Sequence, residues 1–279
     1  MGGHQHNRRG GFTLIELSIV LVIIGLIVGG ILVGQSLIAA ATIRSQITQI
    51  EQINQAVNTF KGKFGELPGD ICSTLAPKFG FATRAGTVGE GDCNGLIEGG
   101  AANSNQWAGE DVLFWNDLST ANLIAGNFVG VDCPLNGTSC KATSVTVPMG
   151  TIIPPAKIGR DNYVTVFPYN GRNAYAILGG GLTGLKTSGG ANANAGATFL
   201  AMTPLESFGI DQKIDDGYPT TGNVLSIDGT WSPQVTPAAG LAGAASSGDC
   251  GNSGTTPTSY NIGASYGNLL SCRISFLFQ

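Results

Sequence analysis

The chain has 279 residues, enough for one large domain or two small ones. Its 14 Lys and Arg against 18 Asp and Glu give a net charge of -4, so nothing in the composition predicts a nucleic-acid partner. Charged residues make up only 11% while Gly numbers 43, which predicts a loop-rich exterior of small polar residues.

Both histidines, His4 and His6, lie near the N-terminus. A chain cleaved after them has no Ser-His or Cys-His nucleophile and no common zinc site, which argues against an enzyme.

The N-terminus joins a short basic segment to a long apolar run. Arg8 and Arg9 precede Gly10-Gly11, and the 22 residues of 12–33 contain one charge, Glu16. As a helix this run extends about 33 Å and can cross a bilayer, with the two arginines holding its start in the cytoplasm. An ordinary secretory signal is cut after its apolar stretch. Here the processing site lies before it, so the mature protein is expected to keep the helix.

This order of features resembles the N-terminus of type IV pilins and type II secretion pseudopilins. The matching residues are Gly11 as the last leader residue, Phe12 as the methylated new N-terminus, Glu16 at the fifth mature position, and Gly25. The resemblance implies cleavage by a prepilin peptidase, residence in the inner membrane, and assembly of copies into an extracellular filament. It also implies that Glu16 pairs with the Phe12 amino group of a neighbouring subunit. Many members carry a proline where this chain has Val33.

The helical pattern continues beyond the membrane segment. Apolar residues recur at three- and four-residue steps from Ile43 to Phe64, with polar residues between them. We therefore predict one helix from Phe12 to about Lys61, which ends before Gly65 and Pro68. The apolar stripe of its second half needs a globular domain to bury it.

These signals divide the chain into three parts. The leader is 1–11, the transmembrane and filament-core segment is 12–39, and the globular part is 40–279. Within the globular part, 40–64 is the amphipathic second half of the helix and 65–279 holds a sheet and loops.

Local patterns in the globular part predict two shorter helices and several strands. Asn170-Gly171 is a turn signal between two strand patterns. Thr203-Pro204-Leu205-Glu206 places a capping hydroxyl, a first-turn proline and a capping carboxylate in order. The expected class is α+β, with a long N-terminal helix packed on a small antiparallel sheet and extended disulfide-bounded loops. The helices are expected from Glu110 to about Ala125 and from Thr203 to about Asp216, and the strands at 144–148, 163–169, 173–178, 224–227 and 271–278.

All six cysteines follow the membrane segment, on the side that faces an oxidising compartment. An even number there predicts three disulfides, although their connectivity is open on sequence alone. Pairing that closes local, turn-rich loops is favoured. The favoured pairs are Cys72 with Cys93, Cys133 with Cys140, and Cys250 with Cys272.

One segment has the spacing of oxygen ligands for calcium. Its acidic and amide residues partly follow the first half of an EF-hand loop, with Gly95 at the sixth place. Ala101 at the twelfth place cannot supply the usual bidentate carboxylate, so a solvated turn beside a disulfide is the competing interpretation. The resemblance to pseudopilins, some of which bind calcium, favours a site. The candidate ligands are Glu90, Asp92, Asn94 and Glu98.

A second acidic group, Asp211, Asp215 and Asp216, is interpreted as the solvated face and end of a short helix.

No cofactor is required by any motif. The best interpretation of the whole chain is a structural filament subunit. A minor pilin or pseudopilin that initiates or tips a filament is the first alternative, because the mature length of 279 minus 11, or 268, residues is large for a repeating subunit. A pilin-anchored adhesin is an alternative from another class.

Overall fold

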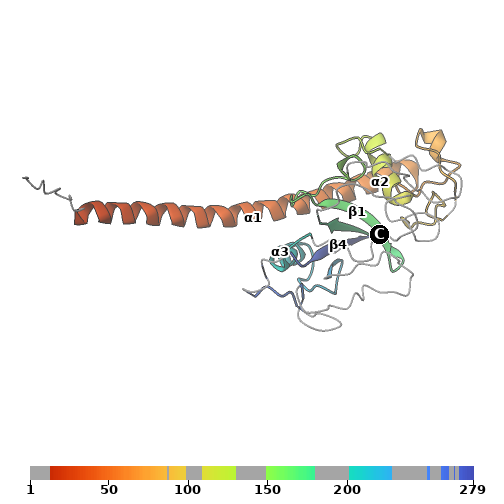
Figure 1. Ribbon diagram of the computed structural model, residues 1–279. Coiled ribbons are helices and arrows are strands. Elements are labelled where there is room, and N and C mark those ends of the chain that lie inside the picture. The colour runs from red at the N-terminus through yellow and green to blue at the C-terminus, as the bar shows by residue number, and fades with distance from the viewer. Residues whose placement is uncertain are drawn as a thin grey trace, which may run out of the picture. The chain divides into compact units, whose positions relative to one another are not determined.

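The computed structural model describes residues 13–86, 88–98, 109–129, 149–179, 201–227, 250–251, 259–263, 267 and 270–279. Figure 1 shows a long helix, shorter helices and a small sheet. The α+β class predicted from the sequence is confirmed. The elements are α1 (Leu14–Phe64), α2 (Glu110–Thr120), α3 (Pro204–Ile214), β1 (Tyr163–Tyr169), β2 (Arg172–Leu178), β3 (Val224–Ile227) and β4 (Arg273–Phe278).

Helix α1 runs for 51 residues without interruption. It continues through Val33, where Ser36 donates its hydroxyl to the Val33 carbonyl at 2.8 Å. The helix ends at Phe64, three residues beyond the expected Lys61, because Gly65 adopts the left-handed φ of 84°. The Gly65 N–H then caps the Lys61 carbonyl at 2.8 Å, which is how a glycine commonly closes a helix.

The chain divides into two compact units, one up to Thr42 and one from Ile43 onward. The described part of the first unit, residues 13–42, is Thr13 followed by the first part of helix α1. In the second unit, one face of residues 43–64 is buried in the main core, as the apolar stripe predicts. Each large side chain that becomes buried contributes about 1.5–3 kcal/mol. The buried residues on this face are Gln46, Ile50, Ile53, Ala56, Val57 and Phe60.

The sheet is antiparallel, with strand order β1-β2-β4-β3. Strands β1 and β2 form a hairpin that pairs Tyr169 with Arg172. Its two turn residues, Asn170 and Gly171, both have positive φ, at 49° and 74°. Two consecutive positive φ values are the requirement of the tight turn that Asn-Gly favours, so the local signal correctly predicted this hairpin. The expected strand at 144–148 lies outside the described residues.

The two shorter helices begin where the sequence predicts and end earlier than expected. Helix α2 stops at Thr120 because Asn122 turns left-handed, at φ 55°, and the Leu123 N–H bonds the Leu118 carbonyl at 3.0 Å. Helix α3 has a complete capping box, in which Thr203 and Glu206 each accept from the other's backbone N–H. It stops at Ile214, after which the Asp215 carboxylate accepts the Val224 N–H at 3.0 Å and fixes the start of β3.

The main core of the second unit lies between α1, α2 and one face of the sheet. Phe60 of α1 contacts Phe81, with ring centroids 5.3 Å apart. Phe114 of α2 contacts Tyr175 of β2, and Tyr175 stacks on Phe278 of β4 at 4.0 Å. Aromatic side chains bury large areas in specific geometries, so they fix how these elements meet.

Two disulfides hold described loops against this core. One joins Cys72 to Cys93 and the other joins Cys250 to Cys272. Both are pairs that the local-loop argument favours. The expected pair of Cys133 and Cys140 lies outside the described residues.

Candidate functional site

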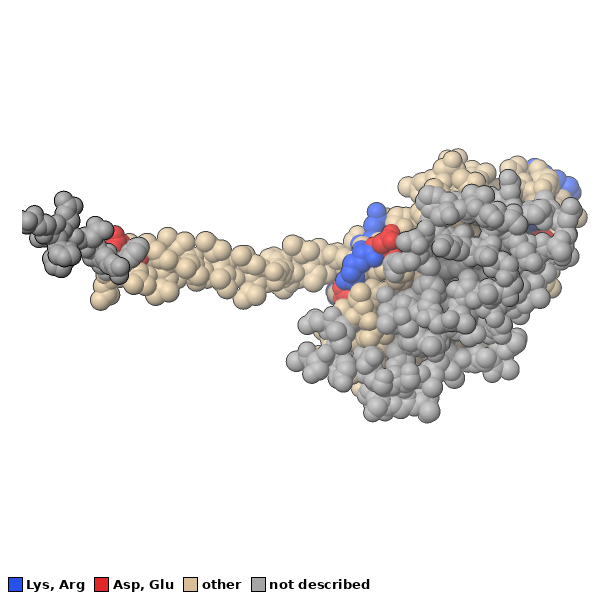
Figure 2. Space-filling model, viewed as in Figure 1, with Lys and Arg blue, Asp and Glu red and all other residues tan. Residues whose placement is uncertain are grey.

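The first unit exposes an apolar surface along the whole of its described length. From Leu14 to Ile38, 17 large apolar side chains are each at least 50% exposed. The visible face of this part of the helix in Figure 2 carries no Lys or Arg. Among the described residues, α1 is the one helix long and apolar enough to cross a membrane, with a mean hydropathy of 2.9 in its most apolar window. Such a surface is stable only against lipid or other protein.

Glu16 closes the first turn of this helix. The Thr13 N–H and hydroxyl both donate to Glu16 Oε2 at 2.8 Å, and the Glu16 N–H donates to the Thr13 hydroxyl at 3.3 Å. This is a capping box, which satisfies N–H groups that a helix start otherwise leaves unpaired. The sequence interpretation gave Glu16 an intermolecular role and missed this local one, although the Thr-x-x-Glu signal was present. The expected cleavage residues Gly11 and Phe12 lie outside the described residues.

The four residues expected to bind calcium do not converge as one set. Asn94 bonds within its own turn: its side-chain amide donates to Asp92 at 3.1 Å and to Glu98 at 2.9 Å. Its own oxygen accepts the Leu96 N–H at 2.7 Å. Glu90 is buried, and its Oε2 has no hydrogen-bond partner in the part of the chain that the structure describes. Of the four expected ligands, Asp92 lies close to acidic residues from outside this loop.

Asp92 lies with Asp70 and Glu110, which come from two other parts of the chain. One carboxylate oxygen from each of the three lies within 4.8 Å of the others. Asp70 follows the end of α1 after a short loop, and Glu110 is the first residue of α2. Sequence reasoning missed both, because their separation along the chain carries no ligand-spacing signal.

The electrostatics of this group follow from burial. Asp70 and Glu110 are both 0% exposed. Burial raises the pKa of Asp70 to about 7, with the Gly95 N–H opposing and the Asp92 carboxylate adding to the rise. Burial also raises the pKa of Glu110 well above its usual range, and the negative charge of Asp70 adds to that effect. Three carboxylates in this setting favour a bound cation or a bound proton.

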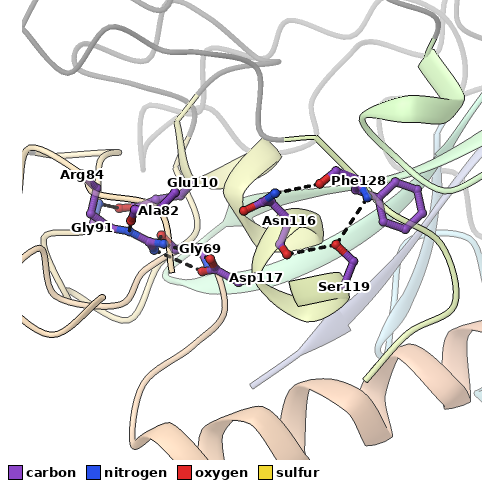
Figure 3. A network of polar contacts seen from close by, with 9 residues as sticks. All are labelled: Gly69, Ala82, Arg84, Gly91, Glu110, Asn116, Asp117, Ser119 and Phe128. Carbon is purple, nitrogen blue, oxygen red and sulfur yellow. Dashed lines mark hydrogen bonds and ion pairs between the residues drawn. The ribbon is translucent and has the colours of Figure 1, made fainter. Parts of the chain in front are cut away.

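A buried salt bridge stands beside this group (Figure 3). Arg84 meets Asp117 of α2 through two guanidinium nitrogens, at 2.9 Å and 3.1 Å, with both side chains 0% exposed. The same arginine donates to the Gly69 carbonyl at 2.8 Å, while the Gly69 N–H donates to Asp117 at 2.7 Å. The Arg84 guanidinium group is therefore bonded to Asp117 and to the loop that precedes Asp70.

Farther along α2, Asn116 and Ser119 bond the backbone of Phe128 (Figure 3).

The second acidic group, Asp211, Asp215 and Asp216, differs from its expected form. Asp211 is 0% exposed and accepts from the Tyr260 hydroxyl at 2.7 Å and the Gly217 N–H at 3.2 Å. The interpretation of Asp211 as part of a solvated face is therefore wrong, because the chain after α3 folds back over it.

Comparison with known proteins identifies the N-terminus. A family model described as the prokaryotic N-terminal methylation motif matches residues 6–32. Searches of curated proteins and of solved structures give no significant match. The matched range contains Gly11, Phe12 and Glu16. The chain thus carries a prepilin-type motif of the kind that marks type IV pilins and pseudopilins.

Proposed function

We propose that this protein is a structural subunit of a type IV pilus-like extracellular filament, and that its work is polymerisation rather than catalysis. The observation that carries the proposal is the exposed apolar surface of α1 directly after a methylation motif. Exposing 17 large apolar side chains to water costs on the order of tens of kcal/mol. The inner membrane covers them before assembly, and the same helix of neighbouring copies covers them in the filament.

Processing prepares the subunit for this exchange. Prepilin peptidase cleaves between Gly11 and Phe12, which removes Arg8 and Arg9 and leaves a free amino group on Phe12. Side-chain charge changes from 14 minus 18, or -4, to 12 minus 18, or -6. The assembly machinery then lifts the cleaved subunit from the membrane into the filament.

Glu16 sets the position of each subunit relative to the next. Both Thr13 bonds go to Oε2, so within the described part of the chain Oε1 remains available to another partner. A carboxylate in an apolar core is costly unless it is paired. The Phe12 ammonium group of an adjacent copy supplies that pair, and it neutralises both charges as the subunit docks.

Three variants separate pairing from capping. Glu16→Gln keeps the capping geometry, because glutamine also serves in a capping box, but it removes the charge. Glu16→Leu removes both, and Thr13→Ala removes the cap while keeping the charge. We expect all three to be cleaved and inserted. Both Glu16 variants should lower the yield of sheared filaments at least tenfold, and Thr13→Ala should not.

The measurement compares processed chain in the membrane with chain in sheared filaments, with intact mass reporting a start at methylated Phe12. Normal filament yield from Glu16→Gln, with loss in Glu16→Leu and Thr13→Ala, would assign Glu16 to capping alone. Wild-type chain that stays in the membrane and enters no filament, even when overproduced, would refute the filament role itself.

A further inference from the structure

We infer that Asp70, Asp92 and Glu110 form a calcium site in the second unit, a property separate from the proposed filament role. Calcium takes oxygen ligands at about 2.3–2.6 Å, so ligands on opposite sides of one ion lie up to about 5 Å apart. The three carboxylate oxygens lie within 4.8 Å of one another, which places all three within reach of a single ion.

The charge of this group is not balanced by the described residues. The two salt bridges among those residues are Arg84–Asp117 and Arg160–Glu206, and neither includes a member of the group. Two of the three carboxylates are fully buried. Buried like charges repel strongly in a medium of low dielectric constant, and a divalent cation removes that repulsion.

One buried oxygen points to a ligand. Asp70 is 0% exposed, yet its Oδ1 has no hydrogen-bond partner among the described residues. Its other oxygen is held by the Gly95 N–H at 2.7 Å. The same carboxyl group contacts that of Asp92. A buried carboxylate oxygen without a partner destabilises the folded state, and coordination to an ion removes that cost.

The ligands are held in place before any ion binds. Glu110 accepts from the Gly91 N–H at 2.7 Å and from the Glu98 N–H at 2.9 Å, one bond on each carboxylate oxygen. Two N–H donors favour its ionised form and leave a lone pair on each oxygen for a metal. Such fixed ligands lower the entropy that binding must remove.

Two backbone features bring the ligand segments together. A disulfide joins Cys72, two residues after Asp70, to Cys93, the residue after Asp92, with Cα atoms 4.9 Å apart. At Gly69 the chain passes so close to α2 that a Cβ there would lie 2.6 Å from the Glu110 carbonyl oxygen. Glycine at this position permits both the close approach and a φ of 85°.

The chemistry selects calcium over other divalent ions. All three ligands are hard oxygen donors, and no His or Cys thiolate joins them among the described residues, which disfavours zinc and copper. Magnesium requires near-octahedral geometry at about 2.0–2.1 Å and keeps several of its waters. Two fully buried carboxylates, one on a loop and one at the start of α2, suit the flexible, water-poor shell of calcium better.

Calorimetric titration of the full chain in detergent micelles, stripped with EGTA, tests this site. Calcium chloride should titrate one site, and the melting temperature should rise with calcium through mass action. Asp92→Asn keeps an acceptor for the Asn94 N–H but loses a ligand charge, and it should weaken calcium binding at least tenfold. Asp70→Asn should do the same, whereas a site built from the loop residues alone predicts no effect of that change. Asp216→Asn, in the other acidic group, should bind like the wild type.

Other results would overturn the inference. Absence of calcium heat and of a melting shift in folded wild-type chain, up to about 10 mM calcium, would leave Asp70 to share a proton with Asp92. Unchanged calcium affinity in Asp92→Asn would overturn the assignment of Asp92 as a ligand. Equal affinity for magnesium chloride would overturn the choice of calcium as the ion. Circular dichroism confirms that each variant is folded. Filament yield plays no part in this measurement, so failure here and failure of the filament role are separate outcomes.

Discussion

The two parts of α1 treat their apolar residues in opposite ways. In the first unit, Ile24 is 51% exposed, and every other large apolar side chain from Leu14 to Ile38 is at least half exposed. In the second unit, Ile53 is 4% exposed and Phe60 is 0% exposed. Both stretches belong to one uninterrupted helix with similar backbone geometry. The difference therefore lies in which partner covers each stretch.

The sequence pattern identifies the partner. An apolar surface on all sides of a helix cannot be covered by one folded domain, so it needs lipid or several neighbouring helices. A stripe on one side needs only one partner, which the same chain supplies through the sheet and α2. Polar groups follow the same division. Within the described residues, the Glu16 carboxylate of the first unit bonds its own turn, whereas Asp117 of the second unit pairs with a buried arginine from a distant loop.

The largest effect is expected where the second unit supplies a partner for a buried charge. Arg84→Met should lower the free energy of unfolding by about 3–5 kcal/mol, because it leaves the Asp117 carboxylate buried without its counter-ion. Arg160→Met is the matched control. The Arg160 and Glu206 side chains are 40% and 20% exposed, and an exposed pair contributes only about 0–1 kcal/mol.

Urea unfolding of both variants, as full chains in mild detergent, measures the two losses. If Arg84→Met costs no more than Arg160→Met, burial of this pair does not set its energy. The second unit would then have another way to accommodate Asp117.

The next effect compares the two parts of α1 directly with one residue type. Ile53→Ala should lower the free energy of unfolding of the second unit by about 2–5 kcal/mol, since it leaves a cavity in the core. Ile24→Ala removes the same atoms from the exposed stretch, where no core within the chain surrounds them. It should change the urea midpoint of the second unit by less than the error of the measurement. Equal losses from the two variants would show that the exposed stretch is covered within the chain after all.

The sequence predicted what local signals determine. The β1–β2 hairpin follows from Asn170-Gly171, and the start of α3 follows from the Thr203 to Glu206 capping box. The predicted end of α2 was wrong because the observed end depends on a left-handed backbone at Asn122. Asparagine permits that conformation but does not require it. Propensity cannot decide such a position when the surrounding structure does.

The candidate sites show the same limit. The capping role of Glu16 was readable from Thr-x-x-Glu, yet the intermolecular interpretation obscured it. The group of Asp70, Asp92 and Glu110 could not be read from spacing. It forms because Gly69 lets the chain pass close to the start of α2. Three-dimensional contact between distant segments is the information that one-dimensional patterns lack.

The smallest expected effect concerns a carboxyl group that the second unit buries without a cation. Burial raises the pKa of Asp211 to about 6, although the Tyr260 hydroxyl and the Gly217 N–H stabilise its ionised form. Asp215 and Asp216 face the same carboxyl group, and their charges also raise its pKa. The folded pKa then exceeds the ordinary value of 3.8, so the folded state binds this proton more tightly than the unfolded state does.

Tighter proton binding in the folded state makes the free energy of unfolding fall as pH rises from about 4 to about 6. For one proton the slope cannot exceed about 1.4 kcal/mol per pH unit.

Asp211→Asn keeps one oxygen for Tyr260 but has no proton to bind, so its free energy of unfolding should change less with pH over this window. Asp161→Asn is the control, because Asp161 is exposed and its φ of 56° is one that asparagine accepts. Urea unfolding at several pH values measures wild type and both variants with EGTA present. Asp70 titrates in all three proteins, so its contribution cancels in the differences. An identical pH dependence in wild type and Asp211→Asn would mean that this buried carboxyl group keeps its charge in the folded protein, held by Tyr260 and Gly217 alone.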